Sequence, residues 1–278
     1  MPSVVFLIPF APRRFKSKWE TSCAHLRQTL RSIQNSTNGN YRVVVAGHEA
    51  PDFDVGFDSR FYFLPLDHPF PSHDNYAVAL RLDKLNKIAA AWNYAKSTGN
   101  PNYVMKLDAD DFISSRLVDW LGKANGEAGY LIKHGWVWRS GSRNIIQCTE
   151  YFDRVCGSCL IIRSDLADRT GPFLTEVEGA VIDQAGREFA ADDQYSLVPG
   201  SGTGTLLLND NHQRYAAQFA YLGYRLATVS FNAAVCRIHA DNAGGGESRG
   251  TQTVRMLLGR IRRTRLVTPG LKKEFMLG

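Results

Sequence analysis

The chain has 278 residues, of which 44% are hydrophobic and 22% are charged, as is typical of globular proteins. No apolar run approaches the roughly 20 residues needed to cross a bilayer, and the first residues lack the basic segment that opens a signal peptide. Five cysteines without a disulfide-framework spacing fit a reducing compartment, so we expect a cytoplasmic protein.

The formal net charge of +6 is concentrated at the carboxyl end of the chain. From Arg249 onward there are eight Lys or Arg and one Glu, a net charge of +7, which leaves −1 for the other residues. Because the body of the chain is nearly neutral, no general basic face is expected, and nucleic-acid binding is disfavoured.

Strand-like and helical patterns alternate along the chain, which predicts an α/β domain with a mostly parallel central sheet and flanking helices. The expected strands cover residues 4–8, 41–46, 61–66, 103–107, 129–138, 159–163, 225–231 and 234–238. The expected helices cover residues 21–34, 80–96, 114–121 and 211–222.

The apolar segment 103–107 is the most informative one, because it ends in three carboxylates, Asp108, Asp110 and Asp111. Like charges clustered at a strand end are costly unless a cation neutralises them. The Asp-x-Asp spacing is the one with which many sugar-nucleotide enzymes hold a divalent ion against a diphosphate. The alternative is a solvated turn that opens the next helix, with Asp111 or Ser114 as its N-cap.

The order of motifs along the chain resembles that of GT-A glycosyltransferases of the family 2 type. The first strand ends in Ile-Pro at residues 8–9, and residues 107–111 match the family's Leu-Asp-x-Asp-Asp. Residues 209–212 resemble its acidic helix start, and residues 236–242 approximate its final Tyr-Arg-x-His-x-x-Asn. The resemblance covers roughly residues 3–245.

The resemblance implies a single GT-A-like domain over residues 1–248, with a nucleotide-binding half (1–112) and an acceptor-binding, catalytic half (113–248), followed by a basic helical tail (249–278). It implies transfer of a sugar from a nucleoside-diphosphate sugar, with UDP-sugars favoured over GDP-sugars, to a saccharide, lipid-linked or protein acceptor. It also implies a divalent cation, Mn²⁺ or Mg²⁺, which hard oxygen ligands hold and which stabilises the leaving diphosphate as a Lewis acid.

Individual residues receive roles from the same resemblance. Asp108 contacts the ribose or a metal-bound water, Asp110 binds the metal directly, and His239 is a further ligand whose imidazole suits Mn²⁺ better than Mg²⁺. The expected metal ligands are thus Asp108, Asp110 and His239. The expected donor-binding residues are Pro9 and Asp108, from the resemblance, and Arg13, Asp83, Lys84 and Lys87, from their positions in the sequence, since the segments that carry these four are not standard in the family. For His239, the alternative is a strand-end histidine packed against a loop.

An inverting transfer needs a general base that takes the proton of the acceptor hydroxyl. Asp210 lies where the family places its base, after a Gly-rich and Ser-rich loop and before a helix. The alternative role for Asp210 is the N-cap of that helix. His212 is a weaker candidate for the base, two residues further on.

Several cations lie near the expected donor site. Arg13 and Arg14 follow the first strand, at the carboxyl edge where α/β folds bind ligands. Arg81, Lys84 and Lys87 recur at helical spacing, and this face points either at a diphosphate or at solvent. The second strand ends in Gly-His-Glu at residues 47–49, where the family usually has an Asp near the nucleotide base.

Two pairs of residues leave two interpretations each. Cys156 and Cys159 have redox or zinc spacing, but no second such pair completes a four-ligand site, so we expect small buried strand residues. Trp136 and Trp138 lie on one face of an expected strand, where their indoles either stack on sugar rings or pack in the core.

The tail is expected to form a basic amphipathic helix over residues 251–266. Its apolar stripe consists of Val254, Leu257, Leu258 and Ile261. This helix either lies on an anionic membrane surface, at the inner membrane face, or docks on the catalytic domain or on a second copy of the chain.

Two other functional classes share the same sheet: a nucleotide-sugar or carbohydrate-binding relative that transfers nothing, and a nucleotidyltransferase. The second is disfavoured because no Gly-rich phosphate loop follows the first strand.

Overall fold

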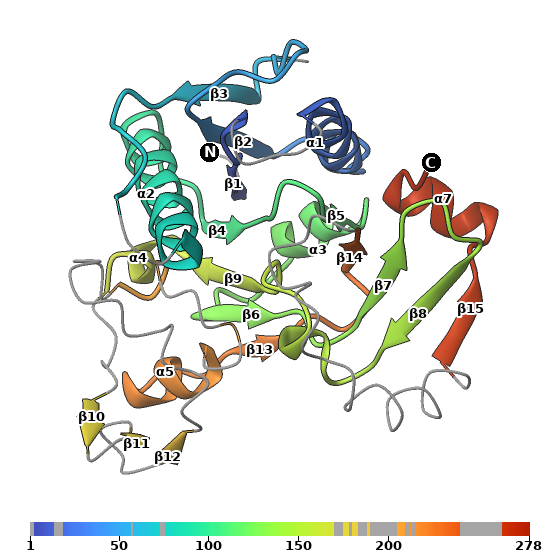
Figure 1. Ribbon diagram of the computed structural model, residues 1–278. Coiled ribbons are helices and arrows are strands. Elements are labelled where there is room, and N and C mark those ends of the chain that lie inside the picture. Colours follow the sequence, from blue (N-terminus) through green and yellow to red (C-terminus); the bar gives the residue numbers. More distant parts are fainter. Residues whose placement is uncertain are drawn as a thin grey trace.

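The structure is a computed structural model that describes residues 3–13, 19–56, 58–72, 76–169, 175–177, 180–182, 188–189, 205–208, 212, 215–239 and 263–278. These residues form a seven-stranded sheet with flanking helices, a five-stranded sheet beside it and a small three-stranded sheet (Figure 1). None of the described helices is long and apolar enough to cross a membrane.

The central sheet has the strand order β13-β6-β9-β4-β1-β2-β3. Its strands are β1 (Val4–Pro9), β2 (Tyr41–Gly47), β3 (Phe61–Pro65), β4 (Tyr103–Lys106), β6 (Gly129–Leu131), β9 (Leu160–Arg163) and β13 (Ala227–Thr228). β9 runs antiparallel to both of its neighbours, and the other pairs are parallel. This sheet confirms the predicted α/β fold with a mostly parallel central sheet.

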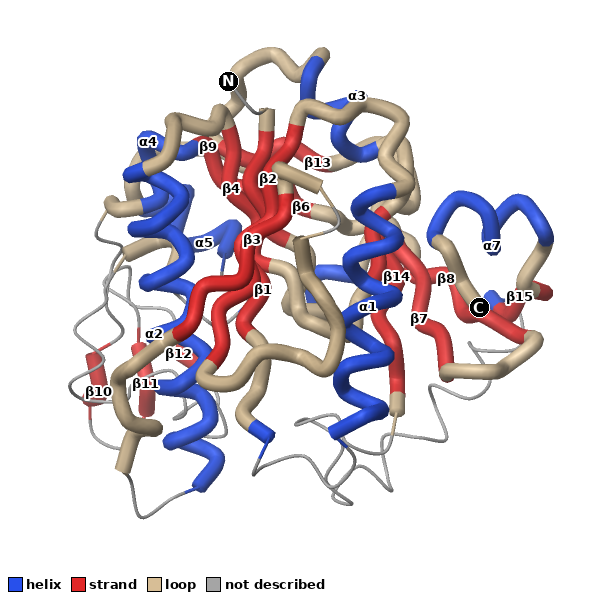
Figure 2. Tube along the Cα trace, turned by 90° about the horizontal axis from the view of Figure 1, so that it is seen from above, coloured by secondary structure: helices blue, strands red, loops and turns tan. Residues whose placement is uncertain are grey.

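Helices cover both faces of the sheet near its first strands. Figure 2 shows α1 (Trp19–Gln34) and α2 (Tyr76–Ser97) on opposite sides of strands β1 to β3. A parallel strand covered on both faces has no polar side, which is why β1 is an unbroken apolar run whose residues 4–8 are fully buried. The hydrophobic core therefore lies on both sides of β1 and β4.

The second sheet has the order β15-β8-β7-β14-β5. Its strands are β5 (Phe112–Ile113), β7 (Gly135–Arg139), β8 (Asn144–Cys148), β14 (Ala234–Ile238) and β15 (Thr264–Leu266). The single strand predicted over residues 129–138 is therefore wrong, because β6 and β7 belong to different sheets. β7 begins at Gly135, where an added Cβ would lie only 2.4 Å from the ring of Phe152, so the turn into the second sheet leaves no room for a side chain.

The remaining elements are short. They are α3 (Leu117–Gly122), η2 (Phe152–Arg154), α4 (Ser164–Ala167), β10 (Thr175–Val177), β11 (Ala180–Ile182), β12 (Glu188–Phe189), α5 (Tyr215–Tyr221) and α7 (Pro269–Phe275). β8, β15 and α7 had no counterpart among the expected elements.

The described end of the basic tail, residues 263–278, is docked on the second sheet. Residues 264–266 form strand β15, paired with β8, where the sequence predicted the last turn of a helix. In α7, Phe275 is fully buried, and Glu274 accepts a 2.5 Å hydrogen bond from the Ser114 hydroxyl. The four residues of the predicted apolar stripe lie outside the described residues.

Candidate functional site

The carboxylate cluster lies at the carboxyl end of β4, where the parallel strands of the central sheet end. The backbone N–H of Leu107 donates to Leu7 of the neighbouring strand, so the strand pairing continues to the first carboxylate. The N–H of Asp111 then donates to the carbonyl of Asp108, at 3.2 Å, which closes a tight turn over residues 108–111. Open α/β sheets bind ligands at this edge, so the cluster lies where a ligand is expected.

Asp110 and His239 come together from positions that are 129 residues apart in the sequence. The Nε2 atom of His239, just after β14, lies 2.7 Å from Oδ2 of Asp110, and both side chains are partly exposed. The two atoms lie at hydrogen-bond distance from each other, and a carboxylate oxygen and an imidazole nitrogen are both ligand types that Mn²⁺ takes. This pair fits the expected divalent cation.

His25 of α1 is a third group at this point. Its ring centroid lies 4.6 Å from that of His239. No sequence pattern points to this contact, because a single histidine in an amphipathic helix does not reveal which side chain it will face.

Asp108 faces a different partner. Its Oδ1 lies 2.8 Å from the Nζ of Lys84, and both side chains are one-third exposed. Its backbone N–H donates to Oγ of Ser158 at 2.9 Å. Within the described part of the chain, Asp108, Asp110 and His239 do not form a three-ligand group whose atoms lie within 4.8 Å of one another. The role of Asp108 as a metal ligand stays a prediction, whereas its contact with Lys84 is a direct geometric feature.

Asp111 is buried beneath the cluster and is not a helix cap. Its Oδ2 accepts hydrogen bonds from Ser158 Oγ at 2.6 Å and from Cys156 Sγ at 3.1 Å, and its Oδ1 accepts the backbone N–H of Arg237 at 3.0 Å. Burial, together with the negative charges of the neighbouring Asp110 and Asp108, raises the pKa of Asp111 to about 8.

The helix after the cluster also begins later than predicted. It starts at Leu117, with Arg116 as the N-cap, and Ser114 Oγ accepts the Arg116 N–H at 3.2 Å. Both N-cap candidates from the sequence, Asp111 and Ser114, are therefore wrong.

A second charged group joins β2 to α2. Asp83 is buried; its Oδ2 lies 2.5 Å from the Nζ of Lys87, which is also buried, and its Oδ1 lies 2.6 Å from Nε2 of His48. Donor contacts by Asp83 and Lys87 stay predictions, and such contacts would require these side chains to leave their mutual pair. Lys84 differs from them because it is partly exposed, on the same helix as the buried pair.

The other predicted donor contacts lie at the end of β1. Pro9 is partly buried and is aligned with Ala46 of β2. Arg13 is exposed; its backbone N–H donates to Glu49, and its guanidinium lies 5.6 Å from the ring centroid of Trp19. Arg14 lies outside the described residues.

The predicted base, Asp210, also lies outside the described residues. His212, its weaker rival, is described, and its Nδ1 contacts the backbone carbonyl of Asp153. The role of Asp210 therefore stays a prediction.

The tryptophan pair and the cysteine pair are core residues. Trp136 and Trp138 are buried in the second sheet, with Phe112 and Phe275 in the same cluster, so of the two interpretations the one that packs them in the core holds. Cys156 and Cys159 are buried as expected.

Comparison with protein-family models gives no match, and comparison with curated proteins gives none either. Comparison with solved structures finds TarS from S. aureus, with 13% identity and a TM-score of 0.46 over 86% of this chain and 37% of TarS. A structure of TarS 1–349 in complex with UDP has 11% identity and a TM-score of 0.48, over 86% of this chain and 61% of that one.

A structure from Desulfovibrio desulfuricans, described as a nucleotide-diphospho-sugar transferase, has 11% identity and a TM-score of 0.38, over 94% of this chain and 96% of that one. The chain thus spans about two fifths of the longer TarS chain and about three fifths of the shorter one.

Proposed function

We propose that the chain transfers a sugar from a nucleoside-diphosphate sugar to a hydroxyl acceptor, with a divalent cation held by Asp110 and His239. The supporting observation is the 2.7 Å approach of the Asp110 carboxylate to the His239 imidazole at the carboxyl edge of the sheet. UDP-sugars are the favoured donors, and the acceptor is a saccharide, a lipid-linked glycan or a protein.

Charge is the central requirement of this reaction. The departing nucleoside diphosphate gains negative charge, and Asp110 and His239 would hold a cation, Mn²⁺ or Mg²⁺, that would supply Lewis-acid stabilisation. Lys84 adds a partly exposed positive charge beside Asp108. The buried pair of Asp83 and Lys87 lies on the same helix as Lys84.

The proton of the acceptor hydroxyl goes to a general base, and Asp210 is our candidate for it. A base on the acceptor side accompanies a single displacement, so the configuration of the transferred sugar inverts. Asp210→Asn should lower turnover by about two to four orders of magnitude, the usual contribution of a general base, with donor binding retained. NMR analysis that shows a product with retained configuration would rule out this assignment, whatever the rate of the variant.

Metal-dependent nucleotide binding tests the central claim without any knowledge of the acceptor. Calorimetry should show that the unaltered chain binds UDP more tightly with Mn²⁺ than without it, and that Asp110→Asn and His239→Gln lose the metal-dependent part. Asp119→Asn is the matched control, because Asp119, on α3, is an exposed carboxylate whose partner is Lys123. Unchanged Mn²⁺-dependent affinity in Asp110→Asn would remove the proposal.

Thermal stabilisation by different nucleotides indicates which nucleotide the donor carries. Thermal stabilisation in the presence of Mn²⁺ should be larger for UDP than for GDP, CDP or nucleoside triphosphates. A preference for a triphosphate would instead favour a nucleotidyltransferase, and nucleotide binding without release of a nucleoside diphosphate from any donor would favour a binding protein.

A further inference from the structure

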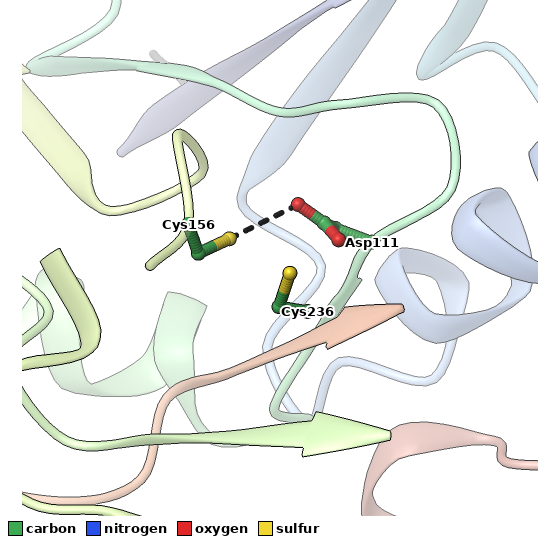
Figure 3. A group of neighbouring side chains, drawn as sticks. All are labelled: Asp111, Cys156 and Cys236. Carbon is green, nitrogen blue, oxygen red and sulfur yellow. Dashed lines mark hydrogen bonds between the residues drawn. The ribbon is translucent and has the colours of Figure 1, made fainter. Parts of the chain in front are cut away.

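We propose that Asp111, Cys156 and Cys236 form a second metal site, separate from the pair of Asp110 and His239, that binds a thiophilic divalent cation such as Zn²⁺. Figure 3 shows the three side chains pointing toward one another beneath the carboxylate turn. This site goes beyond the proposed transfer reaction and does not depend on it.

The geometry matches tetrahedral coordination. One carboxylate oxygen and the two Sγ atoms all lie within 4.8 Å of one another. A tetrahedral Zn²⁺ with Zn–S bonds of about 2.3 Å and a Zn–O bond of about 2.0 Å spaces its ligand atoms roughly 3.5 to 3.8 Å apart. Small rotations of these side chains therefore suffice to bring all three atoms onto one ion.

The ligand chemistry selects the metal. Two sulfur atoms with one carboxylate favour Zn²⁺ over Mg²⁺ or Ca²⁺, which take oxygen ligands. Ser158 Oγ, 2.6 Å from Oδ2 of Asp111, is a polar neighbour for the fourth position, which a water can also fill. Asp111 and Cys156 are buried and Cys236 is partly exposed.

The charges of the three ligands and of a divalent ion nearly balance at this position. Two thiolates and one carboxylate carry three negative charges, so a divalent ion leaves a net charge of −1. Arg237, the residue after Cys236, is buried with its guanidinium 4.3 Å from the ring centroid of Phe112, and its backbone N–H bonds to Asp111. This nearby positive side chain offsets the remaining negative charge.

The two cysteines that come together in the structure are not the pair that the sequence spacing indicates. Cys156 and Cys159 have zinc-like spacing, but the Sγ of Cys159 faces the carbonyl of Asp153 at 4.0 Å. Cys236, on strand β14 and 80 residues after Cys156, takes the place of Cys159. A search of the sequence for paired Cys-x-x-Cys motifs therefore misses the site.

Each proposed ligand adjoins a residue of the candidate active site. Asp111 follows Asp110, Cys236 lies shortly before His239, and Cys156 lies shortly before Ser158, whose Oγ accepts the N–H of Asp108. A bound ion would join these three segments directly, because they belong to a turn, a loop and a strand that the sequence does not connect locally. It would thereby hold Asp110 and His239 at their separation.

Cobalt substitution tests the site in the full-length chain. After chelator treatment, added Co²⁺ should produce thiolate-to-cobalt charge-transfer absorption, and Zn²⁺ should displace it. Cys156→Ser and Cys236→Ser should each weaken Co²⁺ binding by at least about 100-fold. Loss of a residue that only supports a metal ligand weakens metal binding by up to about 100-fold, and loss of a ligand itself should weaken it at least as much. Cys23→Ser, which removes a buried thiol on α1, should leave the absorption intact.

The outcomes separate this proposal from the transfer reaction. Asp110→Asn should keep the charge-transfer band, because the ion proposed at Asp110 and His239 has no sulfur ligand. Absence of the band in the unaltered chain, or its persistence in both serine variants, would overturn the second site and leave the transferase proposal standing. If the serine variants do not fold, X-ray absorption of the zinc-loaded unaltered chain decides: two sulfur ligands support the site, and ligation by nitrogen and oxygen alone overturns it.

Discussion

Truncating Phe275 to alanine should destabilise the whole domain, although only three residues follow it in the sequence. Its side chain is fully buried, and it belongs to a cluster with Phe112, Trp136, Trp138, Ile145, Val235 and Leu277. Polar contacts hold the same helix: Glu274 bonds to Ser114 and Arg116. The cavity left by the missing ring cannot close easily, because β-strands form most of its walls.

The expected size follows from this burial. Removing a buried phenylalanine side chain costs about 3 to 5 kcal/mol, from the lost apolar contact and from the cavity. In a domain of this size each kcal/mol lowers the melting temperature by about 2 to 4 °C, so a decrease of about 10 °C is expected. Leu266→Ala is the control, because Leu266 on β15 is 69% exposed; it should change stability by less than about 0.5 kcal/mol.

Urea unfolding followed by far-UV circular dichroism measures both variants against the unaltered chain. A change below about 1 kcal/mol for Phe275→Ala, with an unchanged slope against urea, would refute the argument, because the end of the chain would then lie outside the cooperative core.

Docking of the tail on the second sheet competes with the alternative that the tail binds a membrane. If the tail binds anionic vesicles, each Lys or Arg near the surface contributes about 1 kcal/mol, and sedimentation with vesicles should weaken steeply as salt rises. Deletion of residues 263–278 should instead yield insoluble protein, because it removes β15 and α7. A soluble deletion variant that no longer sediments with vesicles would support the membrane interpretation over docking.

Three further changes test the energetics of single sites. Lys87→Met should cost about 3 to 5 kcal/mol in urea unfolding, because it leaves the buried Asp83 without its lysine; a cost below about 1 kcal/mol would contradict this. Met276→Gly should raise stability by about 1 kcal/mol, since Met276 has a left-handed φ of 56° that glycine adopts without strain. A loss of stability would show that the contacts of the Met276 side chain outweigh this backbone strain. Burial raises the pKa of Tyr41 from 10 to about 12, so the folded state favours the neutral phenol and loses stability as pH rises from 10 to 12, by up to about 2.7 kcal/mol. Tyr41→Phe should not show this loss when unfolding is measured between pH 10 and 12. If the stability of the variant and that of the unaltered chain fell equally over this range, the reasoning would be contradicted.

The local sequence pattern determined several strands and helices of this protein. The apolar runs of β1 and β4 and the helical spacing of α1 are properties of a few consecutive residues, and strand β14 has the bounds predicted for it. The placement of Asp108 and Asp110 at the carboxyl edge of the sheet is local too, because it needs only a strand and the turn that follows it. The fold and the position of the carboxylates could therefore be predicted.

Contacts between distant segments were decided by the tertiary structure alone. β14 pairs with β5 in a register that sets Val235 opposite Phe112, and this register brings Cys236 and Arg237 to Asp111 and carries His239 to Asp110. Periodicity shows that a residue has a buried face but not which segment covers that face. For the same reason the sequence left open the burial of Asp83 and Lys87, which pair with each other on one helix, and the docking of α7, since both depend on which segments cover these helices once the sheets have assembled.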